Sequence, residues 1–212
     1  MYDEGYYRYR EQTRDFRVES DILMRLLRLK PGCRVLEVGC GGGAFLSRLE
    51  SAGFEAVGVD LMNEAVQAAR DMVKSSTVTC ADAVELPFDE GSFDRLLAHH
   101  LVEHLGDLPA ALGEWRRVLT PGGMIVICTP NRLYPSPRIF DDPSHLHIYD
   151  RAEVCSTVER AGFSVARSMT VFPGLSKDRI SVAVGVPLYR LFRPLPYFKN
   201  RGRSILLSAV RR

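Results

Sequence analysis

The chain has 212 residues, of which 46% are hydrophobic and 25% are charged, and this balance excludes a disordered or fibrous protein. At about 150 residues per domain, the length corresponds to one domain that buries a core without disulfides or metals. The formal net charge is +2, but residues 174–212 carry nine Lys or Arg and a single acid, Asp178. The remainder is therefore net acidic, which indicates either an anionic partner for the C-terminal part or a solvated basic surface.

The sequence pattern predicts neither secretion nor insertion into a membrane. No apolar stretch approaches the roughly 18 residues of a membrane-spanning helix, and the charged, aromatic N-terminus differs from a signal peptide. The five cysteines are scattered and odd in number, a pattern typical of reduced thiols rather than of a disulfide framework. We therefore expect a cytoplasmic protein.

Short apolar runs alternate with helical patterns along the chain. The expected helices cover residues 13–29, 44–52, 63–74 with Asn63 as cap, a segment opened by Asp107 and Pro109 and ended by Pro121-Gly122-Gly123, and 152–161. The expected strands cover residues 34–40, 55–60, 77–82, 93–100, 124–129, 164–172 and 204–210. Strands separated by helices imply right-handed crossovers and a parallel sheet covered on both faces. The last two strands lack a convincing helix between them, so the fold class is a doubly wound, seven-stranded α/β sheet, mostly parallel with one antiparallel strand.

Ligands bind such sheets at the carboxyl ends of the strands. A glycine-rich turn, Gly39 to Gly43, follows the first strand; glycine lets a ligand approach the backbone while the amides of the next helix face it. Asp60 ends the second strand, where a carboxylate can accept both ribose hydroxyls of a nucleoside or can cap the following helix. Together the two features predict an adenosine-containing cofactor, and Gly39-x-Gly41-x-x-Ala44 also fits a dinucleotide.

A third set of motifs separates the candidate cofactors. In chain order it comprises Asp82-Ala83, Leu86-Pro87-Phe88-Asp89, Phe93-Asp94, Val102-Glu103-His104-Leu105 and Leu119-Thr120-Pro121-Gly122-Gly123. With the glycine turn and Asp60, this set resembles the class I S-adenosylmethionine-dependent methyltransferases over about residues 30–172. The resemblance implies an S-adenosylmethionine-binding core over residues 31–173, an N-terminal lid and helix in residues 1–30, and a basic, aromatic insertion with the final strand in residues 174–212.

The resemblance also implies which residues bind the cofactor. By position they are Arg17, Glu37, Gly39, Cys40, Gly41, Asp60, Leu61, Asp82, Ala83 and His99. The matching positions place Glu37 near the methionine amino group, Asp60 at the ribose and Asp82 at the adenine. Arg17 matches a position where relatives place an arginine for the methionine carboxylate. Arg14 is the alternative for this role, and either arginine could instead lie on a solvated helix face.

The spacing His100-x-x-Glu103-His104 would place three metal-binding side chains on one face of a helix. Quinone-biosynthesis O-methyltransferases are similar here, with acids and a histidine that hold a divalent ion, whereas this chain has His100 in place of an acid. The preferred alternative is the family's usual turn, with Glu103 and His104 satisfied by the backbone. No metal is therefore predicted.

A candidate catalytic base lies in residues 141–149, which follow the fifth strand at the rim of the expected site. Histidine accepts a proton readily near physiological pH, and we place His145 first as the base, ahead of His100 and His104. Pro143 stiffens the approach to His145. The alternative is that His145 only fixes its loop and that catalysis relies on proximity.

The C-terminal segment 187–203 alternates aromatic and apolar side chains with Arg and Lys. This pattern predicts a flap over the acceptor, or contact with an anionic membrane surface or a phosphorylated substrate. Nucleic acid is a less expected partner because the rest of the chain is acidic.

The predicted function is methyl transfer from S-adenosylmethionine to an oxygen or nitrogen atom of a small-molecule acceptor, with lipid- or glycan-related molecules among the candidates. A nicotinamide-dependent oxidoreductase is one alternative, although a hydride-transfer motif such as Tyr-x-x-x-Lys is missing. A non-catalytic nucleoside-binding module and, more remotely, a zinc hydrolase built on residues 100–104 are the others.

Overall fold

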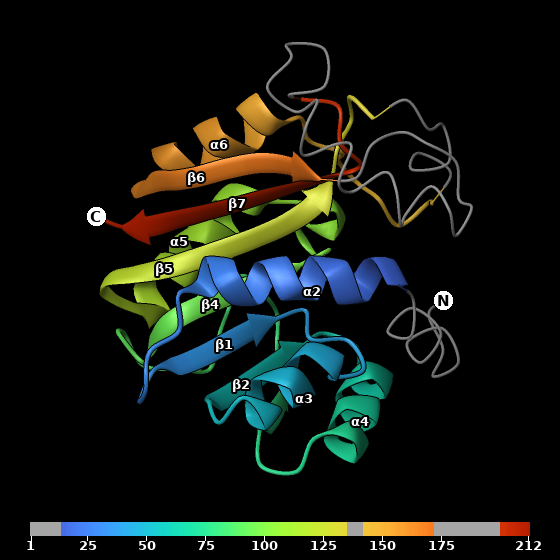
Figure 1. The fold of residues 1–212 in the computed structure, drawn as a ribbon. Coiled ribbons are helices and arrows are strands. Elements are labelled where there is room, and N and C mark those ends of the chain that lie inside the picture. The colour runs from blue at the N-terminus through green and yellow to red at the C-terminus, as the bar shows by residue number, and fades with distance from the viewer. Residues whose placement is uncertain (1–13, 135–141, 172–199) are drawn as a thin grey trace.

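A seven-stranded sheet forms the centre of the computed structural model, which describes residues 14–134, 142–171 and 200–212 (Figure 1). The strands are β1 Arg34–Val38, β2 Glu55–Asp60, β3 Thr77–Cys80, β4 Phe93–His99, β5 Leu119–Pro130, β6 Phe163–Val171 and β7 Ser204–Arg211. Their order across the sheet is β3-β2-β1-β4-β5-β7-β6. Strands β1 to β5 pair in parallel, and β7 runs antiparallel to both β5 and β6. The predicted fold class, with one antiparallel strand, is confirmed.

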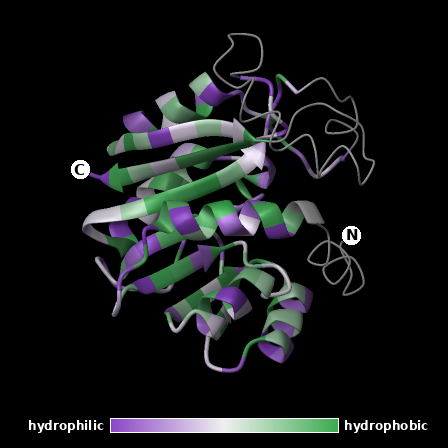
Figure 2. Ribbon diagram, in the orientation of Figure 1, coloured by the Kyte–Doolittle hydropathy of each residue, from purple (hydrophilic) through white to green (hydrophobic). Residues whose placement is uncertain are grey.

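Helices cover both faces of this sheet. They are α2 Arg14–Leu27, α3 Ala44–Ser51, α4 Asn63–Met72, α5 Leu108–Val118, α6 Arg151–Arg160 and a 3-10 turn, η1 Val102–His104. Apolar side chains of α2, α3 and α4 pack into one core cluster, and those of α5 and α6 pack into the other. Figure 1 shows α2 and α3 in front of the sheet with α5 behind it, and Figure 2 shows hydrophobic residues concentrated along the central strands. Within the described residues, no helix is long and apolar enough to cross a membrane.

Local structure differs from the sequence-based expectation at two places. Asn63 is the first helical residue of α4, and Met62 occupies the cap position without a side-chain hydrogen bond, because Asp60 Oδ1 already fixes this turn by accepting from Met62 N at 3.0 Å. The Pro121-Gly122-Gly123 segment lies inside β5, which begins at the buried Leu119.

Other local expectations are confirmed. The Asp107 side chain caps α5 by accepting from Ala110 N at 2.9 Å. The stripe of α5 buries Leu112 and Trp115 in the core. This cap fixes the start of α5 immediately after the turn that carries the candidate histidines, and so helps to position them.

A carboxylate closes the connection between α4 and β3. Glu50 accepts hydrogen bonds from the backbone N–H groups of Lys74, Ser75 and Ser76. Burial alone would raise the pKa of Glu50, but these donors outweigh it and lower the pKa from 4.5 to about 2. A lowered folded-state pKa means that the ionised carboxylate stabilises the fold above pH 4.5, and that this stabilisation disappears as the pH falls toward 2.

We expect Glu50→Gln to lower the free energy of unfolding at pH 7 by about 1–2 kcal/mol. This is less than the full pKa shift implies, because the carboxylate is partly exposed and water screens its contacts. Urea denaturation at pH 7 and pH 3 measures the effect, and the difference between variant and wild type should shrink at pH 3. Glu159→Gln, on the exposed face of α6, is the matched control and should differ from wild type by less than about 0.5 kcal/mol. A pH-independent difference would contradict the assignment.

Candidate functional site

The glycine turn after β1 is held against the end of β2. Gly39 N and Cys40 N both donate to Val59 O, at 2.8 and 3.0 Å. Gly39 has a φ of +72°, and a Cβ there would lie 2.9 Å from Leu101 Cδ1. Both the backbone conformation and the close approach of Leu101 therefore favour glycine at position 39.

Asp60 joins the glycine turn to the start of α4. Its Oδ2 accepts from Gly41 N at 2.9 Å, and its Oδ1 accepts from Met62 N at 3.0 Å. Each carboxylate oxygen offers about two acceptor positions, so one backbone donor on each oxygen still permits a second hydrogen bond. The carboxylate is thereby oriented by the protein itself, beside the predicted neighbour Leu61, whose side chain is 63% exposed.

The remaining predicted cofactor residues also lie at this carboxyl edge. Glu37 is buried in β1 between Gly58 of β2 and Leu97 of β4. Asp82 follows β3, and its Oδ1 accepts from Val84 N at 3.1 Å, while the carbonyl of Ala83 accepts from Trp115 Nε1 at 3.0 Å. The sheet thus brings the ends of β1, β2 and β3 to one edge, as the sequence predicted.

Helix α2 contributes a buried acid that the sequence analysis did not single out. Arg17 lies on the exposed side of α2, whereas Glu19 is 2% exposed; the Arg14 side chain lies outside the described structure. Glu19 Oε2 is 3.3 Å from His99 Nε2 and 3.1 Å from His100 Nε2. The sequence contained a signal for Glu19 that we missed, since an acid four residues before Leu23 falls on the apolar face of the helix.

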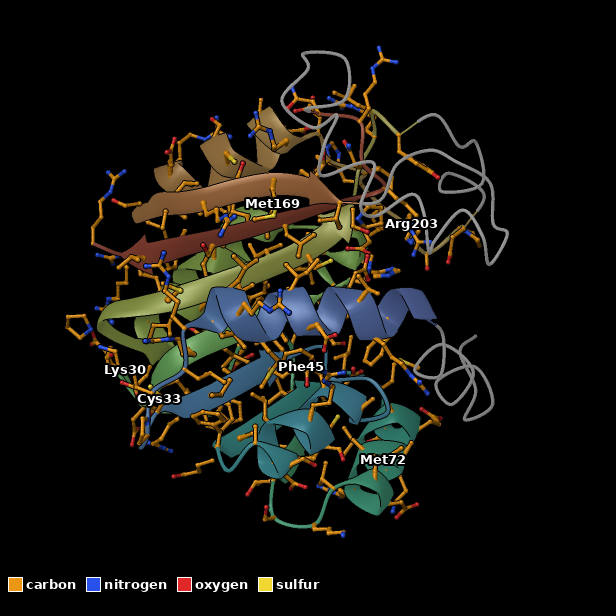
Figure 3. The ribbon with its side chains drawn as sticks, viewed as in Figure 1. Lys30, Cys33, Phe45, Met72, Met169 and Arg203 are labelled. Atoms are coloured by element: carbon orange, nitrogen blue, oxygen red, sulfur yellow. The ribbon has the colours of Figure 1, made fainter. Side chains whose placement is uncertain are left out.

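His99 is enclosed by aromatic rings as well as by this acid. The Phe16 ring stacks on it with centroids 5.4 Å apart, and the Phe45 ring meets it edge-on at 6.4 Å. Phe45 lies on α3 beside α2 in Figure 3, in the layer that covers this face of the sheet. The three elements α2, α3 and β4 therefore fix the His99 ring in a largely apolar environment.

His100 adopts a left-handed backbone conformation, with φ of +55°, which is uncommon for a residue other than glycine. Its Nδ1 is 3.1 Å from Glu103 Oε1, and Glu103 Oε2 accepts from Thr129 Oγ1 at 3.0 Å. An imidazole thus lies between two buried carboxylates, Glu19 and Glu103.

The electrostatics of this network follow from those contacts. Burial alone would raise the pKa of Glu19, but His100 and His99 hold it well below its usual value. Burial would lower the pKa of His100, but Cys128, Glu19 and the hydrogen bond to Glu103 raise it well above its usual value. Burial raises the pKa of the Cys128 thiol to about 11. The carboxylates of Glu19 and Glu103 therefore both favour the protonated form of His100.

A second group of side chains forms the acceptor-side rim. His104 Nδ1 donates to the backbone carbonyl of Ser144 at 3.0 Å, so its Nε2 is the acceptor nitrogen when the ring is neutral. The His104 and His145 rings have centroids 4.9 Å apart, and His145 Nε2 is 3.9 Å from Asp142 Oδ2. Leu146 N donates to the Glu103 carbonyl at 2.8 Å. This hydrogen bond docks residues 142–149, here called the histidine loop, on η1.

The residues of the motif His100-x-x-Glu103-His104 separate into two groups in the structure. Only residues 102–104 form a 3-10 turn, and His100 precedes it. Among the described residues, the ligand atoms that come within 4.8 Å of one another form two groups: Glu19, His99, His100 and Cys128, and Glu103, His104 and His145. His100 and His104 therefore belong to different groups, and the helical face envisaged from the spacing does not form.

Two sequence-based expectations fall outside what the structure describes. These are the N-terminal lid, in residues 1–13, and most of the basic aromatic segment 187–203. Arg203 is described and lies where β7 begins (Figure 3), and its carbonyl accepts from Asn131 N at 2.9 Å. The buried Asn131 side chain also donates to the carbonyls of Asn200 and Gly202, which fastens the entry to β7 beside the end of β5.

Comparisons with known proteins agree with this architecture. Residues 36–127 match the family model described as a methyltransferase domain. A probable S-adenosylmethionine-dependent methyltransferase of Mycolicibacterium smegmatis is 31% identical over 166 residues, which cover 77% of this chain and 65% of that protein. A malonyl-[acyl-carrier protein] O-methyltransferase of Erwinia pyrifoliae is 37% identical over 102 residues, or 47% of this chain and 39% of that protein. Phosphoethanolamine N-methyltransferase 2 of Haemonchus contortus, solved in complex with S-adenosylmethionine, shares the fold with a TM-score of 0.70 at 18% identity, over 92% of this chain and 52% of that one.

The sheet order, the glycine turn and the matched segment together define a methyltransferase domain with a Rossmann-like sheet. Over these residues the chain is similar to the class I S-adenosylmethionine-dependent methyltransferases, and its sheet has their fold. It spans less than two thirds of the length of the two relatives named above.

We expect Thr129→Val to lower the free energy of unfolding by about 1–3 kcal/mol, because it removes a donor from the buried Glu103 carboxylate without changing side-chain volume appreciably. Urea denaturation measures the change. Thr77→Val, at an exposed position of β3, is the control and should alter stability by no more than about 0.5 kcal/mol. Equal stability of Thr129→Val and wild type would show that the Glu103 carboxylate does not depend on this hydroxyl.

Proposed function

We propose that this chain transfers the methyl group of S-adenosylmethionine to an oxygen or nitrogen atom of a small molecule. The observation that carries the proposal is Asp60, a carboxylate at the end of β2 that is oriented by Gly41 N and Met62 N beside the glycine turn. The match of residues 36–127 to a methyltransferase domain supports the choice of cofactor. Neither a nicotinamide-dependent oxidoreductase nor a non-catalytic module gains support from the relatives named above.

The residues present fit the cofactor in chemistry and position. The remaining acceptor positions of Asp60 suit the two ribose hydroxyls. Leu61 and Val84, which are 63% and 39% exposed, would offer apolar surface to an adenine ring, and Asp82 would accept from its amino group. The left-handed Gly39 allows close approach of the methionine part, for which the buried Glu37 supplies a carboxylate. No ordinary side chain at position 39 would leave the same space.

When bound, S-adenosylmethionine supplies a methyl group on a sulfonium with a good leaving group. The protein's own residues then have to orient the acceptor, exclude water and take up a proton. We assign the proton to His145, whose imidazolium Asp142 would stabilise from 3.9 Å. The adjacent His104 is fixed in one tautomer by the Ser144 carbonyl, which makes it a positioning residue or a secondary acceptor. General base catalysis of this kind contributes typically about 10²–10⁴-fold.

The side chains at the acceptor-side rim also indicate which class of acceptor would bind. Leu133 and Leu146 are 45% and 63% exposed beside the histidine loop and the end of β5. Exposed leucines at a site entrance suit an acceptor with an apolar portion, as lipid-related molecules have. The relative from Erwinia pyrifoliae is named a malonyl-[acyl-carrier protein] O-methyltransferase, which supports an oxygen acceptor here.

The cofactor assignment predicts the behaviour of Asp60→Asn. The amide nitrogen of Asn can only donate, so it opposes either Gly41 N or Met62 N and also loses a charge-assisted bond of about 1.5–3 kcal/mol. Isothermal titration should show S-adenosylhomocysteine bound about 10- to 100-fold more weakly. Asp71→Asn, on the exposed side of α4, should bind like wild type. Undiminished affinity in Asp60→Asn would contradict the assignment, and tight binding of NAD by the wild type would favour the oxidoreductase.

The base assignment predicts the behaviour of His145→Ala. Turnover with an acceptor found by screening metabolites against a labelled methyl donor should fall at least tenfold, while the affinity for S-adenosylhomocysteine stays near that of wild type. His147→Ala is the matched control, because His147 is 45% exposed and pairs with Glu153 at 2.7 Å. It should keep its turnover. Normal turnover in His145→Ala would leave catalysis to proximity alone, and loss of thermal stability without a kinetic defect would indicate a loop-fixing role.

A further inference from the structure

Four potential metal ligands converge where α2 crosses the carboxyl ends of β4 and β5. Glu19 comes from α2, His99 and His100 from the end of β4, and Cys128 from β5. One ligand atom from each side chain lies within 4.8 Å of all the others. Glu19, His99 and Cys128 are 2%, 7% and 0% exposed, and the His100 side chain is 15% exposed. The proposed mechanism leaves Glu19 and Cys128 without a role.

We propose that Glu19, His99, His100 and Cys128 form a site for a single transition-metal cation, with zinc as the best-suited ion. Two imidazoles, a thiolate and a carboxylate are the ligand types that zinc prefers. Four protein ligands and no open position are typical of a structural rather than a catalytic zinc site. This argues against a hydrolase and for a metal that fastens α2 to the sheet.

The distances between the ligand atoms agree with a tetrahedral site. Bonds of about 2.0–2.3 Å from zinc to nitrogen, oxygen and sulfur give ligand-to-ligand separations of about 3.3–3.6 Å. Glu19 Oε2 lies 3.3 Å from His99 Nε2 and 3.1 Å from His100 Nε2, and Cys128 Sγ lies 3.8 Å from His100 Nε2. These three of the six edges need to change by only a few tenths of an ångström to enclose an ion, and the other three ligand-to-ligand separations are no longer than 4.8 Å.

The backbone at His100 makes this convergence possible. Successive side chains of an extended strand point to opposite faces of the sheet, so two consecutive histidines would ordinarily be separated. The left-handed conformation of His100 ends the strand and turns its ring toward that of His99, with ring centroids 5.0 Å apart. Such a conformation persists only where the surrounding contacts determine it, and here those contacts are Glu19 and Cys128 of the group together with Glu103.

The outer contacts match those that orient metal ligands. A metal-binding histidine usually donates its second ring nitrogen to a carboxylate, and a metal-binding carboxylate is itself hydrogen-bonded. His100 presents Nε2 to Glu19 and Cys128 while its Nδ1 contacts Glu103 Oε1 at 3.1 Å. Glu19 presents Oε2 to the histidines while its Oε1 accepts from Ser204 Oγ.

The charges are compatible with a cation. Glu19 and Glu103 are both buried carboxylates, and a buried carboxylate is costly unless it is paired. A divalent ion bound by the Glu19 carboxylate, the Cys128 thiolate and two neutral imidazoles forms a neutral complex, so the net charge of the interior is the same as with a protonated His100, and the ion pairs the Glu19 carboxylate directly. Formation of this complex releases the thiol proton of Cys128 and the Nε2 proton of His100 to solvent, while His100 Nδ1–H remains bonded to Glu103.

Cobalt(II) is the probe that tests the site, because it replaces zinc and reports its ligands by absorption. The full chain is stripped with a chelator, dialysed and titrated with cobalt chloride, and then with zinc chloride as competitor. We expect one equivalent to bind with a thiolate-to-cobalt charge-transfer band and the visible bands of tetrahedral cobalt, and zinc to displace it. We also expect the melting temperature to rise with zinc.

Variants assign the ligands. Cys128→Ser should abolish the charge-transfer band and weaken binding at least tenfold, and Glu19→Gln should weaken binding at least tenfold while the band remains at saturation. Cys80→Ser, at an exposed cysteine outside the group, controls for adventitious binding, and His145→Ala controls for the rim group Glu103, His104 and His145; both should bind cobalt like wild type. Circular dichroism checks that each variant is folded. If either Cys128→Ser or Glu19→Gln does not fold, the other variant is enough to test the ligand assignment.

The proposal is overturned if the wild type shows no stoichiometric cobalt or zinc binding, in which case the group is a metal-free hydrogen-bonded network. It is also overturned if the charge-transfer band persists in Cys128→Ser, or if His145→Ala alone abolishes binding. None of these readouts requires turnover, so the result is independent of the proposed methyl transfer.

Discussion

The buried carboxylate of Glu19 is the contact on which the arrangement of this site depends. It reaches from α2 to His99 and His100 at the end of β4 and to Ser204 at the start of β7. In a low-dielectric interior such contacts are strong, and removing one partner of a buried pair costs about 3–5 kcal/mol. That is a large part of the roughly 5–15 kcal/mol by which a domain is stable. Helix α2 therefore cannot separate from the sheet without exposing or isolating charge.

The same network continues to the acceptor side. His100 contacts Glu103, and Glu103 is held by Thr129 of β5 through its side chain and by the histidine loop through its backbone carbonyl. A continuous series of contacts thus runs from α2 through β4 and η1 to His145. Whether a proton or a metal ion lies between Glu19 and His100, the position of the proposed base depends on that series.

The sequence predicted the parts of the site that local geometry determines. The glycine turn, Gly39 to Gly43, lies 17 to 21 residues before Asp60. The two meet because neighbouring parallel strands end together, so pattern and spacing were enough to place them. Glu19 was missed because its partners are 80 and 185 residues away. The division of His100 and His104 was missed because it depends on a left-handed residue that spacing alone does not reveal. Likewise, Asn131 showed no sign in the sequence that it would bind Asn200 and Gly202.

Different interactions therefore determine the two halves of the carboxyl edge of the sheet, one at the ends of β1 and β2 and the other at the ends of β4 and β5. The β1–β2 half is built from backbone amides and one carboxylate, and its geometry follows from strand pairing. The β4–β5 half is built from side chains contributed by distant segments. The histidine loop is attached through the carbonyl of Glu103 and through the Ser144 carbonyl that accepts from His104 Nδ1, and its His147 side chain pairs with Glu153 of α6. Because Leu146 donates its backbone N–H to Glu103 while its side chain stays exposed, the side chain at position 146 can vary without moving the loop backbone. Acceptor preference can therefore change in this half while the proposed cofactor half keeps its shape, and this explains why the sequence identifies a cofactor class more readily than an acceptor.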